Sequence, residues 1–289
     1  MIRRDFFRLL GAAGGAAVAT RAAEAEEPGR AAGADDPVGV LVDTTRCIGC
    51  RMCEFACAHA NGLPKPDWNA EMGPDRDTSP TQWTVVQRHE VAGRTITAKR
   101  QCMHCLQPAC TSACLTKAMY KTPDGPVIWR SSKCMGCRYC MVSCPFDVPK
   151  FEYHSAVPRI QKCQFCTTRV AAGEQPACVA SCRFGALTFG RRGNLLDEAR
   201  RRIYTEEGRY VHHVYGEREA GGTSWLYLSA VPFERIGFRT DVSDESYPGM
   251  NKEFLYAVPQ VDILVPLLLL GLSRVAAARN VPADEEGDA

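Results

Sequence analysis

The spacing of the cysteines constrains this chain more than any other feature. Residues 134–145 read Cys-Met-Gly-Cys-Arg-Tyr-Cys-Met-Val-Ser-Cys-Pro, which is a C-x2-C-x2-C-x3-C-P run. Three thiolates so close in sequence can wrap a loop around three corners of a [4Fe–4S] cubane, while the fourth, before the proline, ligates a neighbouring cluster. The run therefore predicts that a second run of the same kind lies elsewhere in the chain.

The sequence contains three further runs of four cysteines, and we number the four runs motifs 1 to 4 in chain order. Motif 1 has the same spacing as motif 3, whereas motifs 2 and 4 lengthen only the middle gap. Together the motifs use all sixteen cysteines of the chain, which are Cys47, Cys50, Cys53 and Cys57; Cys102, Cys105, Cys110 and Cys114; Cys134, Cys137, Cys140 and Cys144; and Cys163, Cys166, Cys178 and Cys182. The sequence therefore predicts four [4Fe–4S] clusters.

Two other uses of cysteine compete with this interpretation. An exported chain with an even number of cysteines could form disulfides, and structural zinc sites also use C-x2-C pairs. Disulfides need no fixed spacing, and zinc takes its four ligands in two pairs. Neither use explains a C-x2-C-x2-C-x3-C run that occurs twice, so the spacing favours iron–sulfur clusters.

The charge balance of the chain fits anionic cofactors. The formal net charge is +2 at pH 7, and each cluster with its four thiolates adds about −2, or about −8 for four sites. We expect basic residues near the motifs to offset this charge and to raise the reduction potentials locally. These residues are Arg51, Lys133, Arg138, Lys162 and Arg183. The chain has no separate basic stripe, so nothing indicates nucleic-acid binding.

The N-terminus carries a targeting signal. Residues 2–8 read Ile-Arg-Arg-Asp-Phe-Phe-Arg, a twin-arginine motif, and an Ala/Gly-rich apolar stretch follows. Ala23-Glu24-Ala25 fits a small-x-small cleavage site. We therefore expect a twin-arginine signal peptide at 1–25 and a linker at 26–37. The twin-arginine route exports folded proteins, so clusters can be inserted in the cytoplasm before export.

Short strands and turns surround the motifs. We expect strands at 38–42, 186–189 and 225–228, hairpins at 82–90/94–99 and 119–121/127–129, and a helix at 194–203. This order of strand, cysteine loop, short helix and hairpin is that of a two-cluster ferredoxin unit. The predicted fold is thus α+β, with two such units and little regular secondary structure. We assign a four-cluster domain to 38–190, with an insertion at 58–99, and an irregular C-terminal extension to 191–253.

The C-terminus is strongly apolar. Residues 257–278 are apolar apart from Gln260, Asp262, Ser273 and Arg274, but the uncharged part, 263–273, is shorter than the ~20 residues of a spanning helix. An apolar helix docked on the domain is therefore an alternative. We favour a membrane-anchor helix at 254–279, because positive charge follows the apolar run on what would be the cytoplasmic side. Residues 280–289 form an acidic tail.

The arrangement of the four motifs over residues 38–190 resembles that of the ferredoxin-type subunits of respiratory oxidoreductases, which serve molybdopterin enzymes and some hydrogenases. Many members of that family replace one cysteine by tryptophan and carry a [3Fe–4S] cluster, whereas this chain keeps all sixteen cysteines. The chain departs from the pattern in lacking a proline after Cys57, Cys114 and Cys182.

Several segments resemble more closely the electron-transfer subunit of periplasmic uptake [NiFe] hydrogenases of the hydrogenase-2 type. They are Gln-Cys-Met-His-Cys at 101–105, Gly-Cys-Arg-Tyr-Cys-Met-Val at 136–142, Val-Pro-Lys at 148–150 and His-Val-Tyr-Gly-Glu-Arg-Glu-Ala-Gly-Gly-Thr at 213–223. The resemblance implies a location on the periplasmic face of the inner membrane. It also implies three partners: the small and large [NiFe] hydrogenase subunits and an integral membrane quinone-reactive subunit.

Spacing alone leaves open whether motif 3 exchanges its last ligand with motif 2 or with motif 4. The family resemblance implies two interleaved units that pair motif 2 with motif 3 and motif 1 with motif 4. The implied ligand sets are Cys47, Cys50, Cys53 and Cys182 (site 1); Cys57, Cys163, Cys166 and Cys178 (site 2); Cys102, Cys105, Cys110 and Cys144 (site 3); and Cys114, Cys134, Cys137 and Cys140 (site 4).

The sequence indicates electron transfer and no catalytic residues. It shows no nucleophile–base pair, phosphate-binding loop or dinucleotide fingerprint. An enzyme with one open cluster would need a motif with only three cysteines, and every motif has four. We therefore expect a subunit that passes electrons between a hydrogenase module and a membrane quinone. The alternative is the same role beside a molybdopterin oxidoreductase or a formate dehydrogenase.

Metal analysis tests the cluster assignment. We expect about sixteen iron ions per chain, since each of four cubanes holds four. Electron paramagnetic resonance (EPR) of the fully reduced protein should show interacting [4Fe–4S]+ signals. Stoichiometric zinc, or a [3Fe–4S] signal in freshly isolated oxidised protein, would contradict four complete cubanes.

Overall fold

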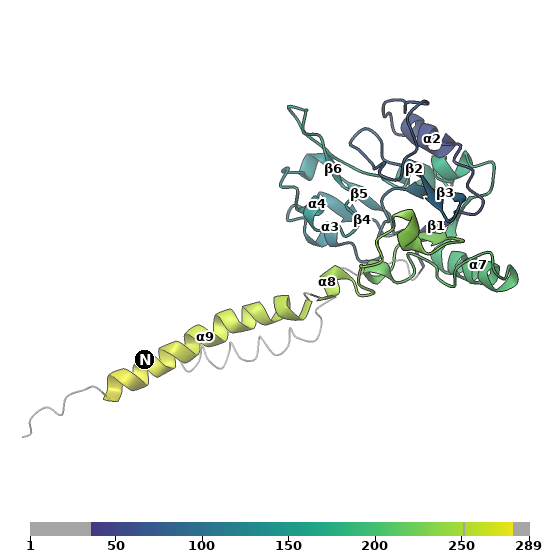
Figure 1. Cartoon of the computed structure of the whole chain (residues 1–289). Coiled ribbons are helices and arrows are strands. Elements are labelled where there is room, and N and C mark those ends of the chain that lie inside the picture. Colours follow the sequence, from purple (N-terminus) through teal and green to yellow (C-terminus); the bar gives the residue numbers. More distant parts are fainter. Residues whose placement is uncertain (1–35, 251, 280–289) are drawn as a thin grey trace, which may run out of the picture.

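Figure 1 shows the computed structural model of the chain, which describes residues 36–250 and 252–279. The expected signal peptide at 1–25, the linker up to residue 35 and the tail at 280–289 lie outside the described residues. Short strands and helices lie together in one part of the picture, and a long C-terminal helix extends from them.

The central strand of the largest described sheet is β1 (Val38–Asp43), which confirms the strand predicted at 38–42. It pairs antiparallel with β8 (Leu187–Arg191) and parallel with β9 (Trp225–Leu228). Alternate residues of β1 pack against α7 (Arg192–Thr205) on one face and against an aromatic core on the other. Because both faces are covered, β1 is a continuous apolar run.

The C-terminal extension is packed into this sheet. It contains α7 and β9, which confirms the helix predicted at 194–203 and the strand predicted at 225–228. Its other described elements are short: η2 (Glu219–Gly221), η3 (Phe233–Ile236) and α8 (Tyr247–Met250). Since β9 lies beside β1, the extension completes the sheet that the cluster domain begins.

Three hairpins contain the remaining described strands. They are β2 (Val85–Val91) with β3 (Arg94–Arg100), β4 (Met119–Lys121) with β5 (Val127–Trp129), and β6 (Lys150–Phe151) with β7 (Ile160–Gln161). The first two confirm the predicted hairpins. The third escapes prediction because strands of two residues leave no periodic pattern. In the first hairpin Ala92 and Gly93 have φ of 50° and 74°, the left-handed conformation of a type I′ turn.

Short helices follow or contain the cysteine loops. α2 (Met52–Ala60) belongs to motif 1, α3 (Ala109–Ser112) to motif 2, α4 (Tyr139–Val142) to motif 3, and α5 (Thr167–Ala171) and α6 (Ala177–Ala180) to motif 4. α2 packs against α6, and α3 packs against α4. In Figure 1, α3 and α4 lie with β4 and β5 in one half of the domain, and α2 lies with β2 and β3 in the other.

A buried carboxylate ties the insertion at 58–99 to motif 1. Glu54 of α2 is 1% exposed. Its carboxylate accepts hydrogen bonds from Arg51 Nε (3.1 Å), Arg76 Nη2 (2.8 Å), Gln82 Nε2 (2.9 Å) and the Val86 N–H (2.6 Å). A buried carboxylate is stable only when it is paired and hydrogen-bonded in this way. Three of these partners belong to the insertion, so Glu54 fixes the insertion against the first cysteine loop.

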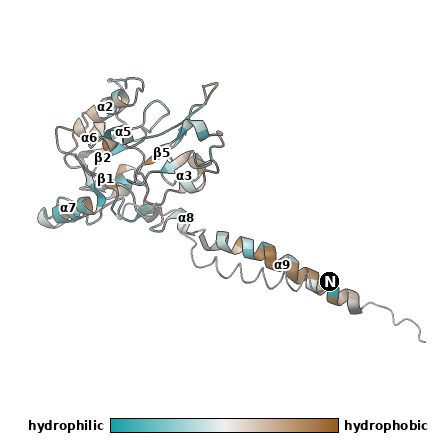
Figure 2. Cartoon of the chain, turned by 180° about the vertical axis from the view of Figure 1, so that it is seen from behind, coloured by the Kyte–Doolittle hydropathy of each residue, from teal (hydrophilic) through white to brown (hydrophobic). Residues whose placement is uncertain are grey.

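The C-terminal helix α9 (Lys252–Arg279) follows α8 (Tyr247–Met250), which packs against α3. Within α9 the segment Tyr256–Ala277 is long and apolar enough to cross a membrane, with a mean hydropathy of 1.6. Figure 2 shows hydrophobic colouring along much of α9, which points away from the domain. Residues 256–277 are exposed, so the helix is not docked on the described domain.

Candidate iron–sulfur sites

The four C-x2-C turns share one backbone feature. The residue before the second cysteine has a positive φ in every turn: Gly49 (74°), His104 (49°), Gly136 (75°) and Phe165 (59°). Such a residue turns the chain sharply and gathers N–H groups on the concave side of a loop, where they can meet an anion. In motif 4 the Phe165 N–H donates to Sγ of Cys163 at 3.3 Å. The loops are therefore shaped to hold negatively charged sulfur.

Motifs 1 and 4 lie close to each other. Burial raises the pKa of Cys47, and the neighbouring Cys182 adds to the rise. Burial also raises the pKa of Cys57, to which Cys163 and Cys178 contribute. The last cysteine of each motif thus lies near cysteines of the other motif.

Motifs 2 and 3 are related in the same way. Burial raises the pKa of Cys105, and Cys144 of motif 3 contributes to the rise. Burial raises the pKa of Cys140 to about 12, and Cys114 of motif 2 contributes. The neighbours are those named for sites 1 to 4 above. Which thiolate binds which cluster stays a prediction.

Cysteines of adjacent groups also affect each other's pKa through their charges. The pairs whose charges act across two groups are Cys53 with Cys178, Cys163 with Cys102, and Cys110 with Cys140. These pairs connect the groups in the order site 1, site 2, site 3 and site 4. In the implied ligand sets the four groups are thus successive neighbours, and they would form the row that stepwise electron transfer requires.

The sulfur of Cys114 accepts hydrogen bonds that favour its anionic form. The N–H groups of Ala118 and Met119 donate to its Sγ at 3.1 and 3.3 Å. Burial alone would raise the pKa of Cys114, but these hydrogen bonds and that of the Thr116 hydroxyl outweigh it and lower the pKa. The thiolate is the form that binds metal. Because β4 begins at Met119, the strand holds one of the donors in place.

The cysteines fit cubane clusters better than the two alternatives. All sixteen lie within the described residues, and none of them forms a disulfide. In that part of the chain no group of three or more His, Cys, Asp or Glu side chains is close enough to hold a single metal ion, whereas zinc needs four ligands at about 2.0–2.3 Å. A cubane distributes its four ligands over four iron ions, so these looser groups suit it.

Three lysines among the motifs bring positive charge into the interior. Lys99 and Lys162 are 2% and 1% exposed, and Lys121 is half-buried. Their ammonium groups donate to neutral carbonyl and amide oxygens, and none of them forms an ion pair within residues 36–250.

An ammonium group buried without a partner costs several kcal/mol. Anionic sites of about −2 each would supply the missing negative charge. The residues of the chain therefore fit [4Fe–4S] clusters in their charge as well as in their donor atoms.

His104 of motif 2 packs against motif 4 as a neutral residue. It is fully buried, its Nδ1 accepts a hydrogen bond from the Val127 N–H at 2.9 Å, and its ring meets Phe165 edge-on at 4.9 Å. Burial, together with the charges of Lys162 and Lys121, places the pKa of His104 well below its usual range.

Sequence reasoning identified only part of this interior charge. Of the five basic residues expected to offset the clusters, Lys162 is buried as required. Arg51 is also buried, but its charge is paired with Glu54. The remaining three, Lys133, Arg138 and Arg183, are exposed.

Lys99 and Lys121 are not among the basic residues that the sequence indicated. Both are in hairpin strands, where a lysine usually points to solvent, so no local pattern marks them as interior.

Comparison with known proteins agrees with this chemistry. Two family models, each described as a 4Fe-4S dicluster domain, match residues 46–118 and 94–192. A protein of Nitratidesulfovibrio vulgaris is 48% identical over 299 residues, which covers 100% of this chain and 81% of the relative.

Two further relatives have informative names. The hydrogenase-2 operon protein HybA of Escherichia coli O157:H7 is 31% identical over 284 residues, covering 86% of each chain. The iron–sulfur subunit of the nitrate-inducible formate dehydrogenase of Escherichia coli K12 is 32% identical over 250 residues, covering 83% of this chain and 80% of the relative.

The fold and the cysteine groups define a protein with two 4Fe-4S dicluster domains and a C-terminal helix. The chain belongs to the family of ferredoxin-type iron–sulfur subunits that transfer electrons in respiratory oxidoreductase complexes of the hydrogenase and formate dehydrogenase type. This confirms the family that the sequence motifs indicated.

Gly49 and Gly136 provide a matched test of the loop geometry. They occupy the same place in motifs 1 and 3, and alanine at either position costs about 1–2 kcal/mol of backbone strain. A Cβ at 136 meets nothing within 4 Å, whereas a Cβ at 49 would lie 3.0 Å from Thr97 Cγ2. In denaturant titrations, Gly49→Ala should therefore lose its iron–sulfur absorbance earlier than Gly136→Ala.

Thr97→Ser supplies the control for this comparison. It removes Cγ2 but keeps the hydroxyl that donates to the Cys47 carbonyl at 2.6 Å. Combined with Gly49→Ala, it should bring the midpoint close to that of Gly136→Ala. Equal midpoints of the two single variants would show that Thr97 does not crowd the loop.

Proposed function

We propose that the chain carries electrons along four [4Fe–4S] clusters, between a periplasmic [NiFe] hydrogenase and an integral membrane quinone-reactive subunit. The observation that carries this proposal is the row of four cysteine groups. Each cluster, when bound, accepts and releases one electron. The chain itself contributes the sulfur ligands, the N–H donors to sulfur and the interior positive charge.

The ligand sets proposed are those of sites 1 to 4, in two interleaved units. Two features support the exchange of ligands between motifs. α2 packs against α6, and α3 packs against α4. In addition, Cys182 lies near Cys47, and Cys144 lies near Cys105. In this arrangement each unit holds two clusters and each motif shares its last cysteine.

The location follows from the two ends of the chain. The twin-arginine motif at residues 2–8 supports export of the folded domain. The apolar segment Tyr256–Ala277 supports a membrane anchor. α8 packs against α3, and the Ser246 hydroxyl donates to Gln107 Oε1 at 2.5 Å. The anchor thus begins beside motif 2, and we assign electron exit towards the quinone to the half of the domain that holds sites 3 and 4.

The catalytic partner has two candidates. The segments at 101–105, 136–142 and 213–223 favour a hydrogenase, as does similarity to HybA along 86% of this chain. The similar identity to a formate dehydrogenase subunit keeps formate dehydrogenase as the second candidate. Purification of the intact complex followed by identification of its catalytic subunit distinguishes them. A nickel-containing subunit with hydrogen-oxidising activity is expected, and a molybdopterin subunit would favour the second candidate.

Serine variants test the exchange of ligands. Cys47→Ser and Cys182→Ser should disturb the same EPR signal, because both residues are assigned to site 1. Cys163→Ser should disturb a different signal, because Cys163 is assigned to site 2. If Cys182→Ser instead reproduces the spectrum of Cys163→Ser, each motif keeps its own last cysteine and the interleaved arrangement is wrong.

Truncation after residue 254 tests the anchor. The clusters should remain, since no cysteine lies beyond Cys182. Attachment to membranes and electron flow to quinone should weaken, while hydrogen oxidation with a soluble dye survives. Arg3→Lys with Arg4→Lys serves as the comparison, because it should keep the protein in the cytoplasm unless a partner supplies a signal. A truncated protein that still sediments with membranes and reduces quinone would rule out the anchor.

A further inference from the structure

Lys99 is a buried cation on β3 without a carboxylate partner. It is 2% exposed, and its Nζ donates to Gln101 Oε1 at 2.7 Å. The same ammonium lies 4.3 Å from the centre of the Trp225 ring, in the geometry of a cation–π contact. The described residues 36–250 offer it no ion pair.

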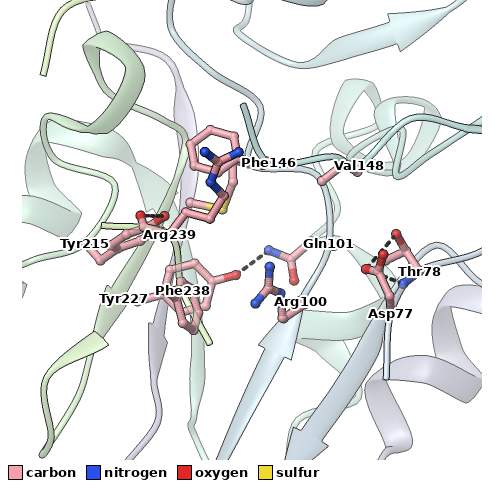
Figure 3. A pocket seen from close by; sticks show the side chains of 11 residues that line it. Asp77, Thr78, Arg100, Gln101, Phe146, Val148, Tyr215, Tyr227, Phe238 and Arg239 are labelled. Atoms are coloured by element: carbon pink, nitrogen blue, oxygen red, sulfur yellow. Dashed lines mark hydrogen bonds between the residues drawn. The ribbon is translucent and has the colours of Figure 1, made fainter. Parts of the chain in front are cut away.

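Two neighbours prevent the ammonium from turning away. Gln101 Nε2 donates to the Tyr227 hydroxyl at 2.6 Å, and that hydroxyl donates to the Lys99 carbonyl at 3.0 Å. Figure 3 shows Gln101 directed at Tyr227, beside a cavity of about 20 Å³, which is room for about one water molecule. Gln101 therefore holds the ammonium in place through its carbonyl oxygen and is itself held through its amide nitrogen.

Two contacts place Lys99 beside motifs 1 and 4. The Trp225 ring that meets its ammonium packs edge-on against Phe165 of motif 4 at 5.8 Å. Thr97, two residues before it on β3, donates to the Cys47 carbonyl of motif 1 at 2.6 Å.

The charge of Lys99 acts on Cys53 and Cys57 of motif 1 and on Cys163 and Cys178 of motif 4, where it opposes the rise in pKa that burial causes. Burial alone would lower the pKa of Lys99, but the charges of Cys178, Cys53, Tyr227 and Cys163 outweigh it and raise the pKa. Its hydrogen bond to Gln101 Oε1 and its position over the Trp225 ring are those of an ammonium group. For motif 2, the lysines with this effect are Lys121 on Cys105 and Lys162 on Cys110.

We propose that Lys99 is a positioning residue for charge, which raises the reduction potentials of the clusters at sites 1 and 2 together, while Lys121 and Lys162 lie nearer to site 3. The inference rests on the four-cluster function proposed above. Reduction adds one electron to a site and takes its total charge from about −2 to about −3. A fixed positive charge stabilises the more negative state more strongly, so the site is easier to reduce.

Burial makes this effect large. Charges in the interior are screened much less than charges at the surface. Lys133 directly precedes Cys134 in the sequence, but it is exposed. Distance along the sequence would favour Lys133 as the residue that tunes a cluster, whereas burial favours Lys99. The two lysines therefore make a matched pair for experiment.

The experiment is a redox titration, followed by EPR, of the intact complex with Lys99→Met, Lys99→Arg or Lys133→Met. Methionine keeps the length of the side chain and removes its charge, and arginine keeps the charge. In Lys99→Met we expect two of the four midpoint potentials to fall by at least the equivalent of a tenfold change in the reduction constant, about 59 mV for one electron. The other two potentials, and all four in Lys99→Arg and Lys133→Met, should shift by less than half of that.

The possible results distinguish failure of the tuning role from failure of the four-cluster function. Iron-replete Lys99→Met with unchanged potentials overturns the inference, as does an equal shift in Lys133→Met. If Lys99→Met loses iron, Lys99→Gln is titrated in its place. Loss of iron from both, with full iron in Lys99→Arg, would mean that the charge is needed for cluster retention, and the tuning role would be wrong. If the wild-type protein does not show four one-electron steps, the four-cluster function fails, whatever the role of Lys99.

Discussion

Thiolate charge in the interior is the constraint on which the rest of this structure depends. Burial raises the pKa of most of the buried cysteines, Cys57 and Cys105 among them. The protein must therefore stabilise the buried thiolates by other interactions. It does so with N–H groups in left-handed turns and with lysines that have no carboxylate partner in the described chain. The buried lysines would destabilise the domain if the sites carried no negative charge. The stability of the fold therefore depends on the negative charge of the bound clusters.

This constraint also explains why regular secondary structure is sparse. A cubane occupies space that side chains would fill in an ordinary core, and its ligands come from loops. The helices of the motifs are mostly single turns, as in α3 and α4, and serve to bring loops together. Extended structure is left to the edges: the sheet around β1 closes one side, and the hairpin of β2 and β3 places Thr97 and Lys99 against the first and last motifs.

Much of this organisation could be predicted from the sequence. Motif spacing identified the cofactor class, and alternation with turn residues identified the strands β1, β8 and β9 and two hairpins. The left-handed turns could be predicted at Gly49 and Gly136, but not at His104 and Phe165, where loop closure imposes a conformation that these residues rarely adopt. The buried position of Lys99 could not be predicted for a different reason. A strand pattern shows which face a residue is on, but it does not show that the face will meet anionic sulfur.

The pairing of β1 with β9 has a consequence for how the protein is made. β1 leaves the ribosome roughly 180 residues before its parallel partner, and domains complete their folding only when all their elements have emerged. Until residue 228 is synthesised, the sheet lacks one edge and the aromatic core lacks Trp225 and Tyr227. All sixteen cysteines have emerged by residue 182. The chain thus contains its complete set of cysteines before its last strand can close the sheet, so the order of synthesis leaves the cysteine loops uncovered on that side until β9 is added.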